Sequence, residues 1–219
     1  AAIAHELNQP LTAIRTTASS SQLLLQRQQF DAVAENLDRM AMMTERMALI
    51  TSQLKTFAHK RPEKLGEVAM KGAIEHVLSM FSERLDSESV DLQLQLQQPV
   101  SVYGDLPRIE QVLINLIRNA LDAMASVSEV QPRILRIGLS YDDDMAKVEI
   151  ADRGCGISEE VLAHLFDPFF TTKDVGEGLG LGLSISYGII RDLEGSIKAE
   201  NNPEGGACFK LLLPRYRGS

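Results

Sequence analysis

The first residue with evident chemical potential is a histidine near the start of the chain. In the stretch AAIAHELNQPLTAI, the apolar residues recur at the spacing of one helix face: Ile3, Leu7, Leu11 and Ile14. His5 lies on the opposite face of such a helix, together with Gln9. Glu6 is an adjacent carboxylate that can accept the Nδ1 proton and leave the Nε2 lone pair free to attack. Most single histidines on a polar helix face are merely solvated, and it is the neighbouring Glu6 that favours a presented nucleophile here.

A second group of polar side chains lies on a helix predicted over Asp105–Ala125. Apolar residues fill most of its circumference, and the remaining outward arc includes Asn115, Asn119 and Asp122. Asparagine is a mediocre helix former, so two of them four residues apart in a helix interior need a reason. An amide oxygen is a suitable ligand for Mg²⁺ held between a protein and nucleotide phosphates. The arc therefore predicts a magnesium–nucleotide contact.

Two glycine-containing segments follow this helix. In Asp152–Ile157, a carboxylate at a strand end precedes Gly154 and Gly156, which suits the close approach of a flat ligand. Asp152 could accept a hydrogen bond from the exocyclic amine of adenine, where guanine has an oxygen. The segment Gly176–Gly182 opens the next predicted helix, and its amides can cradle phosphate. A dinucleotide fold is excluded because no strand precedes these glycines.

Two groups of elements must position these residues. Residues 1–28 and Asp31–Ala58 have helical periodicity and are joined by a short polar turn. The second helix has Asn36 at the one polar position of an otherwise apolar seam made of Val33, Met40, Met43, Met47, Ile50, Leu54 and Phe57. One antiparallel hairpin cannot bury both seams, so we expect a symmetric dimer that forms a four-helix bundle.

Pro62, within the linker Lys60–Lys64, ends the second helix, and the pattern then becomes mixed α/β. Besides the asparagine helix, the predicted elements are helices over Ala69–Leu85, Ser158–Leu165 and Leu183–Leu193 and strands over Val90–Leu96, Ile134–Ser140, Lys147–Ile150, Ser196–Glu200 and Ala207–Leu213. The predicted class is α+β, with an N-terminal helical domain over 1–61 and a second domain over 62–219.

The composition of the chain excludes several classes of protein. The 219 residues have a formal net charge of −8, which argues against nucleic-acid binding because phosphate neutralisation needs a cationic face. The apolar runs are too short to cross a bilayer. Cys155 and Cys208 have neither metal-ligand nor disulfide spacing, as expected in a reducing cytoplasm. The chain starts inside a helical pattern, so we expect it to be part of a longer protein.

Five segments in this order resemble the H, N, G1, F and G2 boxes of sensor histidine kinases: His5–Pro10, Arg108–Asp122, Asp152–Ile157, Phe166–Lys173 and Gly178–Gly182. The resemblance implies a dimerisation and histidine-phosphotransfer hairpin followed by an ATP-binding α/β sandwich of the gyrase type. It also implies that ATP donates a phosphoryl group to Nε2 of His5, which passes it to an aspartate in the receiver domain of a response regulator. The implied activity is that of a protein-histidine kinase.

The resemblance also implies residue roles. His5 would be the phosphoacceptor and Glu6 the residue that activates it. Asn119 would be the main Mg²⁺ ligand with Asn115 assisting, and Asp152 would anchor adenine. The other positions implied at the nucleotide are Asp122, Lys173 near the phosphates, and Gly154, Gly156, Gly178, Gly180 and Gly182, which shape the site and its lid.

Finer features extend the resemblance. HELNQPLTAIR and the later FAHKRPEKL are similar to sensor kinases for C4-dicarboxylate transport. This similarity implies a cytoplasmic kinase portion of an inner-membrane sensor, linked to the membrane only through an upstream segment. Gln9 stands where many members have Thr or Asn, and we expect it to orient water for dephosphorylation of the regulator. Two alternatives remain open: an ATPase or serine kinase of the same ATP-binding fold, and a nucleotide-binding dimeric scaffold.

Overall fold

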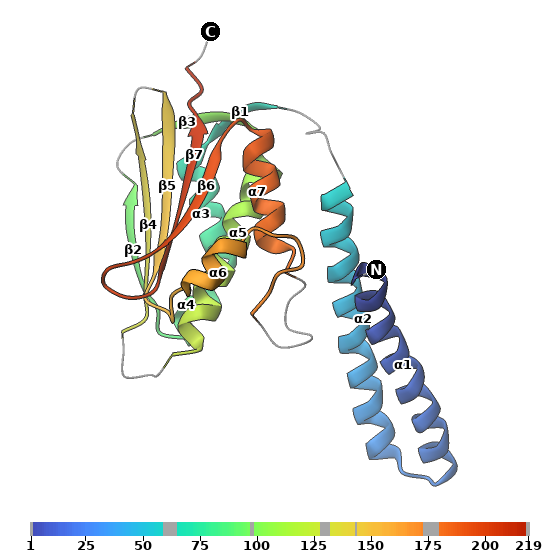
Figure 1. The fold of residues 1–219 in the computed structure, drawn as a ribbon. Coiled ribbons are helices and arrows are strands. Elements are labelled where there is room, and N and C mark those ends of the chain that lie inside the picture. Colours follow the sequence, from blue (N-terminus) through green and yellow to red (C-terminus); the bar gives the residue numbers. More distant parts are fainter. Residues whose placement is uncertain are drawn as a thin grey trace. The chain divides into compact units, whose positions relative to one another are not determined.

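The computed structural model describes residues 2–58, 65–96, 99–127, 132–142, 144–172 and 180–217, with only the helical backbone described for 2–9, 45–46 and 48–58. The described residues form two compact units, one up to residue 58 and the other from residue 65 onward (Figure 1). The predicted linker Lys60–Lys64, with the domain boundary inside it, lies outside the described residues. Each unit is therefore described separately.

The first unit is a helical hairpin of α1 (Ala2–Gln26) and α2 (Phe30–Ala58) (Figure 1). The predicted polar turn is confirmed: Gln28 adopts a positive φ of 59°, and the Gln29 N–H donates to the carbonyl of Leu24 at 3.0 Å. The predicted polar position in the seam is confirmed as well. The Asn36 amide donates to the buried Ser21 hydroxyl at 3.1 Å, so the two helices share a polar contact within an apolar interface.

One part of the predicted apolar stripe faces outward. Pro10 and Ser21 are buried in the hairpin, whereas the Leu11 side chain is 53% exposed. Leu25, two heptads after Leu11, is also exposed. The reason is geometric, because a helix in a two-helix hairpin has one inward seam and any second apolar line must face away from it.

The second unit contains two sheets and five helices among the described residues. Its elements are β1 (Gly66–Ala69), α3 (Met70–Met80), α4 (Ser82–Ser87), β2 (Asp91–Leu96), β3 (Ser101–Gly104), α5 (Leu106–Ala125), β4 (Ile134–Tyr141), β5 (Met145–Asp152), α6 (Glu159–His164), α7 (Gly182–Asp192), β6 (Ser196–Asn201) and β7 (Ala207–Pro214). The main sheet has the order β2-β4-β5-β7-β6, in which β2 is parallel to β4 and the other neighbours are antiparallel. The helices cover one face of this sheet (Figure 1).

The core of the second unit lies between that sheet and helix α5. Alternate residues of β5 are buried, as period-two strand geometry requires when one face packs against helices. Helix α5 is N-capped by Asp105, whose carboxylate accepts a hydrogen bond from the Arg108 N–H at 3.3 Å. It packs against α3 and α7 on either side and against β5, so the predicted asparagines lie on the central helix of the unit.

Two predictions for the second unit were wrong in detail. The helix predicted over Ala69–Leu85 is two helices, because Phe81 leaves the helical conformation with φ −104° and ψ 4°. Strands β1 and β3 were not predicted, and they pair antiparallel with each other, with Glu67 opposite Tyr103. Four residues contain too few alternations to separate a strand from a loop by periodicity.

Strand β5 is longer than predicted, so Asp152 is its last residue rather than a residue beyond it. Within the described part of the chain, no helix has the combination of length and hydrophobicity that membrane crossing requires.

Candidate functional site

Asp152 is a charged residue inside the fold, with 2% of its surface exposed. Its Oδ1 accepts two backbone hydrogen bonds, from the Gly154 N–H at 2.8 Å and from the Ala207 N–H at 3.2 Å. Burial raises the pKa of this carboxyl above its usual value, and the two N–H donors act in the opposite direction. Because both donors bind Oδ1, Oδ2 is the oxygen that can serve a further donor.

Glycines allow the loop after Asp152 to approach its neighbours closely. Gly206 has a φ of +82°, and a Cβ there would lie 2.1 Å from the Asp152 carbonyl oxygen. A Cβ at Gly154 would lie 2.7 Å from the carbonyl carbon of Ala123 on α5. Only glycine permits these contacts. The loop therefore lies directly on α5, about one turn after Asn119.

Asn119 and Asn115 have different environments, although the sequence placed both on one outward arc. Asn119 is half-buried. Asn115 is 7% exposed, and its amide donates to the Ser186 hydroxyl of α7 at 3.0 Å. The outward placement of Asn115 was therefore wrong, because α7 covers this part of α5. Gly182 makes the close packing possible, since a Cβ there would lie 2.3 Å from Asn115 Oδ1.

The aromatic segment meets the second glycine segment at the start of α7. The Phe169 N–H donates to the Gly180 carbonyl at 3.0 Å, and both residues have positive φ. A Cβ at Gly180 would lie 2.5 Å from the Phe170 carbonyl oxygen. These contacts join two predicted motifs that are separated along the chain.

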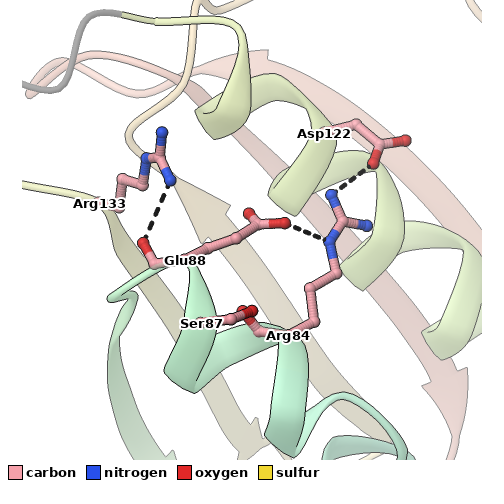
Figure 2. A network of polar contacts seen from close by, with 5 residues as sticks. All are labelled: Arg84, Ser87, Glu88, Asp122 and Arg133. Carbon is pink, nitrogen blue, oxygen red and sulfur yellow. Dashed lines mark hydrogen bonds and ion pairs between the residues drawn. The ribbon is translucent and has the colours of Figure 1, made fainter.

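Asp122, which the sequence grouped with the nucleotide residues, forms an ion pair with the side chain of Arg84 (Figure 2). Arg84 of α4 donates from Nη2 to Asp122 Oδ1 at 2.8 Å and from Nε to Glu88 Oε1 at 2.6 Å. Arg133 donates to the Glu88 carbonyl at 3.2 Å (Figure 2). Asp122 therefore links the asparagine helix to α4, a role that the sequence did not suggest.

Asn201 is a further residue that the motifs did not include. Its amide donates to the Ile157 carbonyl at 2.7 Å and accepts from the Ile157 N–H at 2.8 Å. Gly156, with a φ of +72°, precedes this contact. No motif of the sequence analysis covers the end of β6, so periodicity there indicates only a strand.

The structure thus brings together, within the second unit, Asn119, the Asp152 loop and the described glycines of the second segment. The remaining predicted residues cannot be compared in this way. His5, Glu6 and Gln9 belong to α1, but their side chains lie outside the described residues. Lys173 and Gly178 also lie outside them.

Comparisons with known proteins identify both units. Residues 1–62 match the His Kinase A (phospho-acceptor) domain, and residues 104–217 match the family of histidine kinase-, DNA gyrase B- and HSP90-like ATPases. The C4-dicarboxylate transport sensor protein DctB of Pseudomonas aeruginosa is 40% identical over 220 residues, which cover 100% of this chain and 36% of that protein. The chain spans about a third of the length of such curated relatives.

Solved structures agree with this assignment. The catalytic domain of histidine kinase ThkA superposes with a TM-score of 0.62 at 32% identity, covering 69% of this chain and 98% of that one. ThkA in complex with response regulator protein TrrA gives a TM-score of 0.74 at 26% identity, covering 98% of this chain and 60% of that one. These matches confirm the predicted fold class and the resemblance to sensor kinases. The chain belongs to the histidine kinase family, with a phospho-acceptor hairpin followed by an ATPase domain of the type shared with DNA gyrase B and HSP90.

Proposed function

We propose that this chain is the kinase portion of a two-component sensor, which transfers the γ-phosphoryl group of ATP to His5 and then to a response regulator. The observation that carries the proposal is Asp152, buried at the end of β5 with two backbone N–H groups on Oδ1. Oδ2 is then the acceptor for the exocyclic amine of adenine. Guanine has a carbonyl oxygen at that position, which would repel the carboxylate, so ATP is preferred over GTP.

Asn119 is the proposed main ligand for Mg²⁺, with Asn115 assisting. The fit rests on the chemistry of the donors, because amide oxygens are hard ligands suited to this ion. The Asn115 amide nitrogen already donates to Ser186, which fixes the amide plane so that Oδ1 is its available donor to a metal. When bound, Mg²⁺ supplies neutralisation of the phosphate charge.

The glycine segments complete the proposed nucleotide site. The close contacts of Gly154, Gly156, Gly180 and Gly182 set the shape of its walls. Lys173 and Gly178 are proposed to lie near the phosphates by their place in the motif. Asp122 is proposed to hold α5 against α4 through Arg84 and not to touch the nucleotide.

The proposed first reaction is a single phosphoryl transfer from ATP to His5. Nε2 of His5 forms a bond to the γ-phosphorus, the bond to the bridging oxygen breaks, and ADP leaves. Glu6 accepts the Nδ1 proton in a hydrogen bond and keeps the lone pair on Nε2. Catalysis then depends on positioning, for which the hairpin and the nucleotide unit must meet.

A receiver-domain aspartate is the proposed second acceptor. It attacks the phosphohistidine and releases neutral His5. Support comes from the similarity to ThkA, which was solved in complex with a response regulator. Gln9 is proposed to orient the water that hydrolyses the regulator's phosphoaspartate, which is the phosphatase activity of such a kinase. We further propose that this chain is the cytoplasmic kinase portion of an inner-membrane sensor. The similarity to the C4-dicarboxylate transport sensor protein DctB supports this proposal.

A homodimer is proposed because the hairpin exposes large apolar side chains on its outer surface. Leu11, Leu25 and Leu37 are large apolar side chains exposed on the single hairpin. A second copy would cover them in a four-helix bundle. Light scattering of Leu25→Glu beside the wild type tests this, because a buried carboxylate should shift the mass towards the monomer.

Autophosphorylation with γ-labelled ATP and Mg²⁺ tests the central proposal in the wild type and in His5→Gln. We expect an acid-labile, alkali-stable label that is lost in the variant. Label retained in His5→Gln would favour a serine kinase or ATPase of the same fold. ATP binding without any label would favour the dimeric scaffold.

A further inference from the structure

The turn between β6 and β7, residues 201–206, lies against the loop that follows Asp152. This turn contains none of the residues that the sequence analysis assigned to a site. Its backbone is held by its own hydrogen bonds: the Asn202 N–H donates to the Gly206 carbonyl, and the Gly205 N–H donates to the Asn202 carbonyl, both at 2.9 Å. It is therefore a formed structural element against which a neighbouring loop can be positioned.

Asn201 holds the far end of the Asp152 loop. Its side-chain amide binds both backbone groups of Ile157, accepting from the N–H at 2.8 Å and donating to the carbonyl at 2.7 Å. Two hydrogen bonds from one planar amide restrain the orientation of the Ile157 backbone as well as its position. The fit is close, because a Cβ at Gly156 would lie 3.1 Å from Asn201 Oδ1.

The same turn holds the near end and the middle of the loop. At the near end, Gly206 packs on the Asp152 backbone, and the N–H of Ala207, the first residue of β7, donates to Asp152 Oδ1. In the middle, Arg153 donates to Glu204 at 2.7 Å. This ion pair is partly solvent-exposed and contributes little by itself. The bidentate contact at Asn201 is thus the main restraint that the turn places on the far end.

We propose that Asn201 is a positioning residue for nucleotide-base recognition: it holds the loop from Asp152 to Ile157 in the conformation that presents the Asp152 carboxylate to adenine. The inference rests on the assignment of Asp152 to adenine in the proposed function. The loop would contact the base and not the transferred phosphoryl group. Its conformational order therefore changes the binding free energy of the nucleotide by the same amount in the ground state and in the transition state. Such an interaction changes KM and leaves kcat unchanged.

A base-selectivity measurement separates positioning from a merely structural role. Loosening the loop weakens both the attraction of Asp152 for the adenine amine and its repulsion of the guanine oxygen. The ratio of ATP affinity to GTP affinity should therefore fall. General loss of stability would lower the fraction of folded protein and weaken binding of both nucleotides by the same factor.

The variant is Asn201→Ala, with Asn202→Ala as the matched control. Among the described residues, the Asn202 side chain accepts only from the Glu204 N–H, at 3.2 Å, inside the turn. For Asn201→Ala we expect about tenfold weaker ATP binding by calorimetry, a matching rise in KM for autophosphorylation and an unchanged kcat. The ATP-to-GTP affinity ratio should fall in Asn201→Ala and stay at the wild-type value in Asn202→Ala.

A second variant keeps the proposal testable if the alanine variant folds poorly. Asn201→Asp retains an acceptor for the Ile157 N–H, but its second carboxylate oxygen would repel the Ile157 carbonyl, so ATP affinity and the ATP-to-GTP ratio should fall at least as far as in Asn201→Ala. Wild-type ATP affinity and selectivity in either well-folded Asn201 variant would overturn the inference, as would equal losses for ATP and GTP.

Failure of the proposed function gives a different result. If the wild type binds ATP but labels no histidine, the kinase proposal fails, and the binding data for the Asn201 variants still decide the inference. If the wild type binds no nucleotide, both are overturned.

Discussion

The side-chain amide of Asn115 donates a hydrogen bond to the hydroxyl of Ser186 at 3.0 Å, and both residues are buried. Ser186 in turn donates to the Gly182 carbonyl, also at 3.0 Å. This chain of hydrogen bonds joins the middle of α5 to the first turn of α7. The helix that carries Asn119 and the end of the second glycine segment are therefore held in one rigid arrangement.

The first prediction concerns Gly182 and Asn115. Gly182→Ala should destabilise the second unit by about 1–3 kcal/mol, because its methyl group would overlap Asn115 Oδ1. In an Asn115→Ala background the same change should cost less, since the overlapping oxygen is gone. Urea denaturation of the four proteins, without nucleotide, gives the coupling energy. Strictly additive effects would show that the close approach is not the cause.

The second prediction separates binding from folding at Asp152. Asp152→Asn should weaken ATP binding by about 10–100-fold, because an amide nitrogen cannot accept from the adenine amine. The fold should persist, since an Asn oxygen can accept from the same two backbone N–H groups. Calorimetric titration with ATP and a thermal melt measure the two effects. Unchanged affinity in a folded variant would remove Asp152 from the site.

The third prediction is a pH dependence with a defined sign. Burial raises the pKa of Asp152, so its carboxyl gains a proton at a higher pH than an ordinary aspartate does. ATP affinity should therefore fall on acidification while exposed carboxylates are still ionised. For stability the sign is opposite: this carboxyl favours the folded state most below its unfolded pKa, and that contribution is lost as the pH rises through the raised value.

Asp152→Asn is the control for both pH effects. In that variant, the acid-side loss of the remaining ATP affinity should move to lower pH or disappear. The stability that the protonated carboxyl adds in acid should also vanish from the difference between the two proteins. Identical pH profiles for variant and wild type would contradict the assignment.

The fourth prediction compares two glycines. Gly154→Ala should weaken ATP binding by about tenfold or more, because its methyl group would push the Asp152 loop away from Ala123. Gly188 lies in the middle of α7, and apart from its chain neighbours and the adjoining helix backbone no atom of the described residues lies within 4 Å of a Cβ placed there. Gly188→Ala should instead stabilise the unit by about 0.5–1 kcal/mol. ATP titrations should show weaker binding for Gly154→Ala and wild-type binding for Gly188→Ala, and thermal melts should show a higher midpoint for Gly188→Ala.

The fifth prediction tests whether Asp122 joins two helices or contacts the nucleotide. Arg84→Met removes the contact between α4 and α5 shown in Figure 2, and Asp122→Asn removes the charge of its acceptor. Because the pair is partly exposed, each change should cost about 1 kcal/mol of stability or less. ATP affinity should stay near the wild-type value in both. A loss of affinity in Asp122→Asn alone would indicate a direct contact between Asp122 and the nucleotide.

Local patterns in the sequence were enough for the architecture. The hairpin, the polar position at Asn36, the α5 helix and the order of the motifs were all predicted correctly. Periodicity and helix caps are properties of neighbouring residues, so they can be read without knowing what packs against them. The prediction for Asp152 likewise rested on its type and on its place at a strand end, and the structure adds that this carboxylate is buried.

Only the tertiary structure decided which polar residues face a ligand and which face another element. Asn115 and Asn119 look alike on a helix projection, yet α7, some 70 residues later, covers one of them. Arg84 reaches Asp122 across 38 residues, and Asn201 reaches Ile157 across 44. A single sequence contains no local signal for such pairs, because they depend on how distant elements pack.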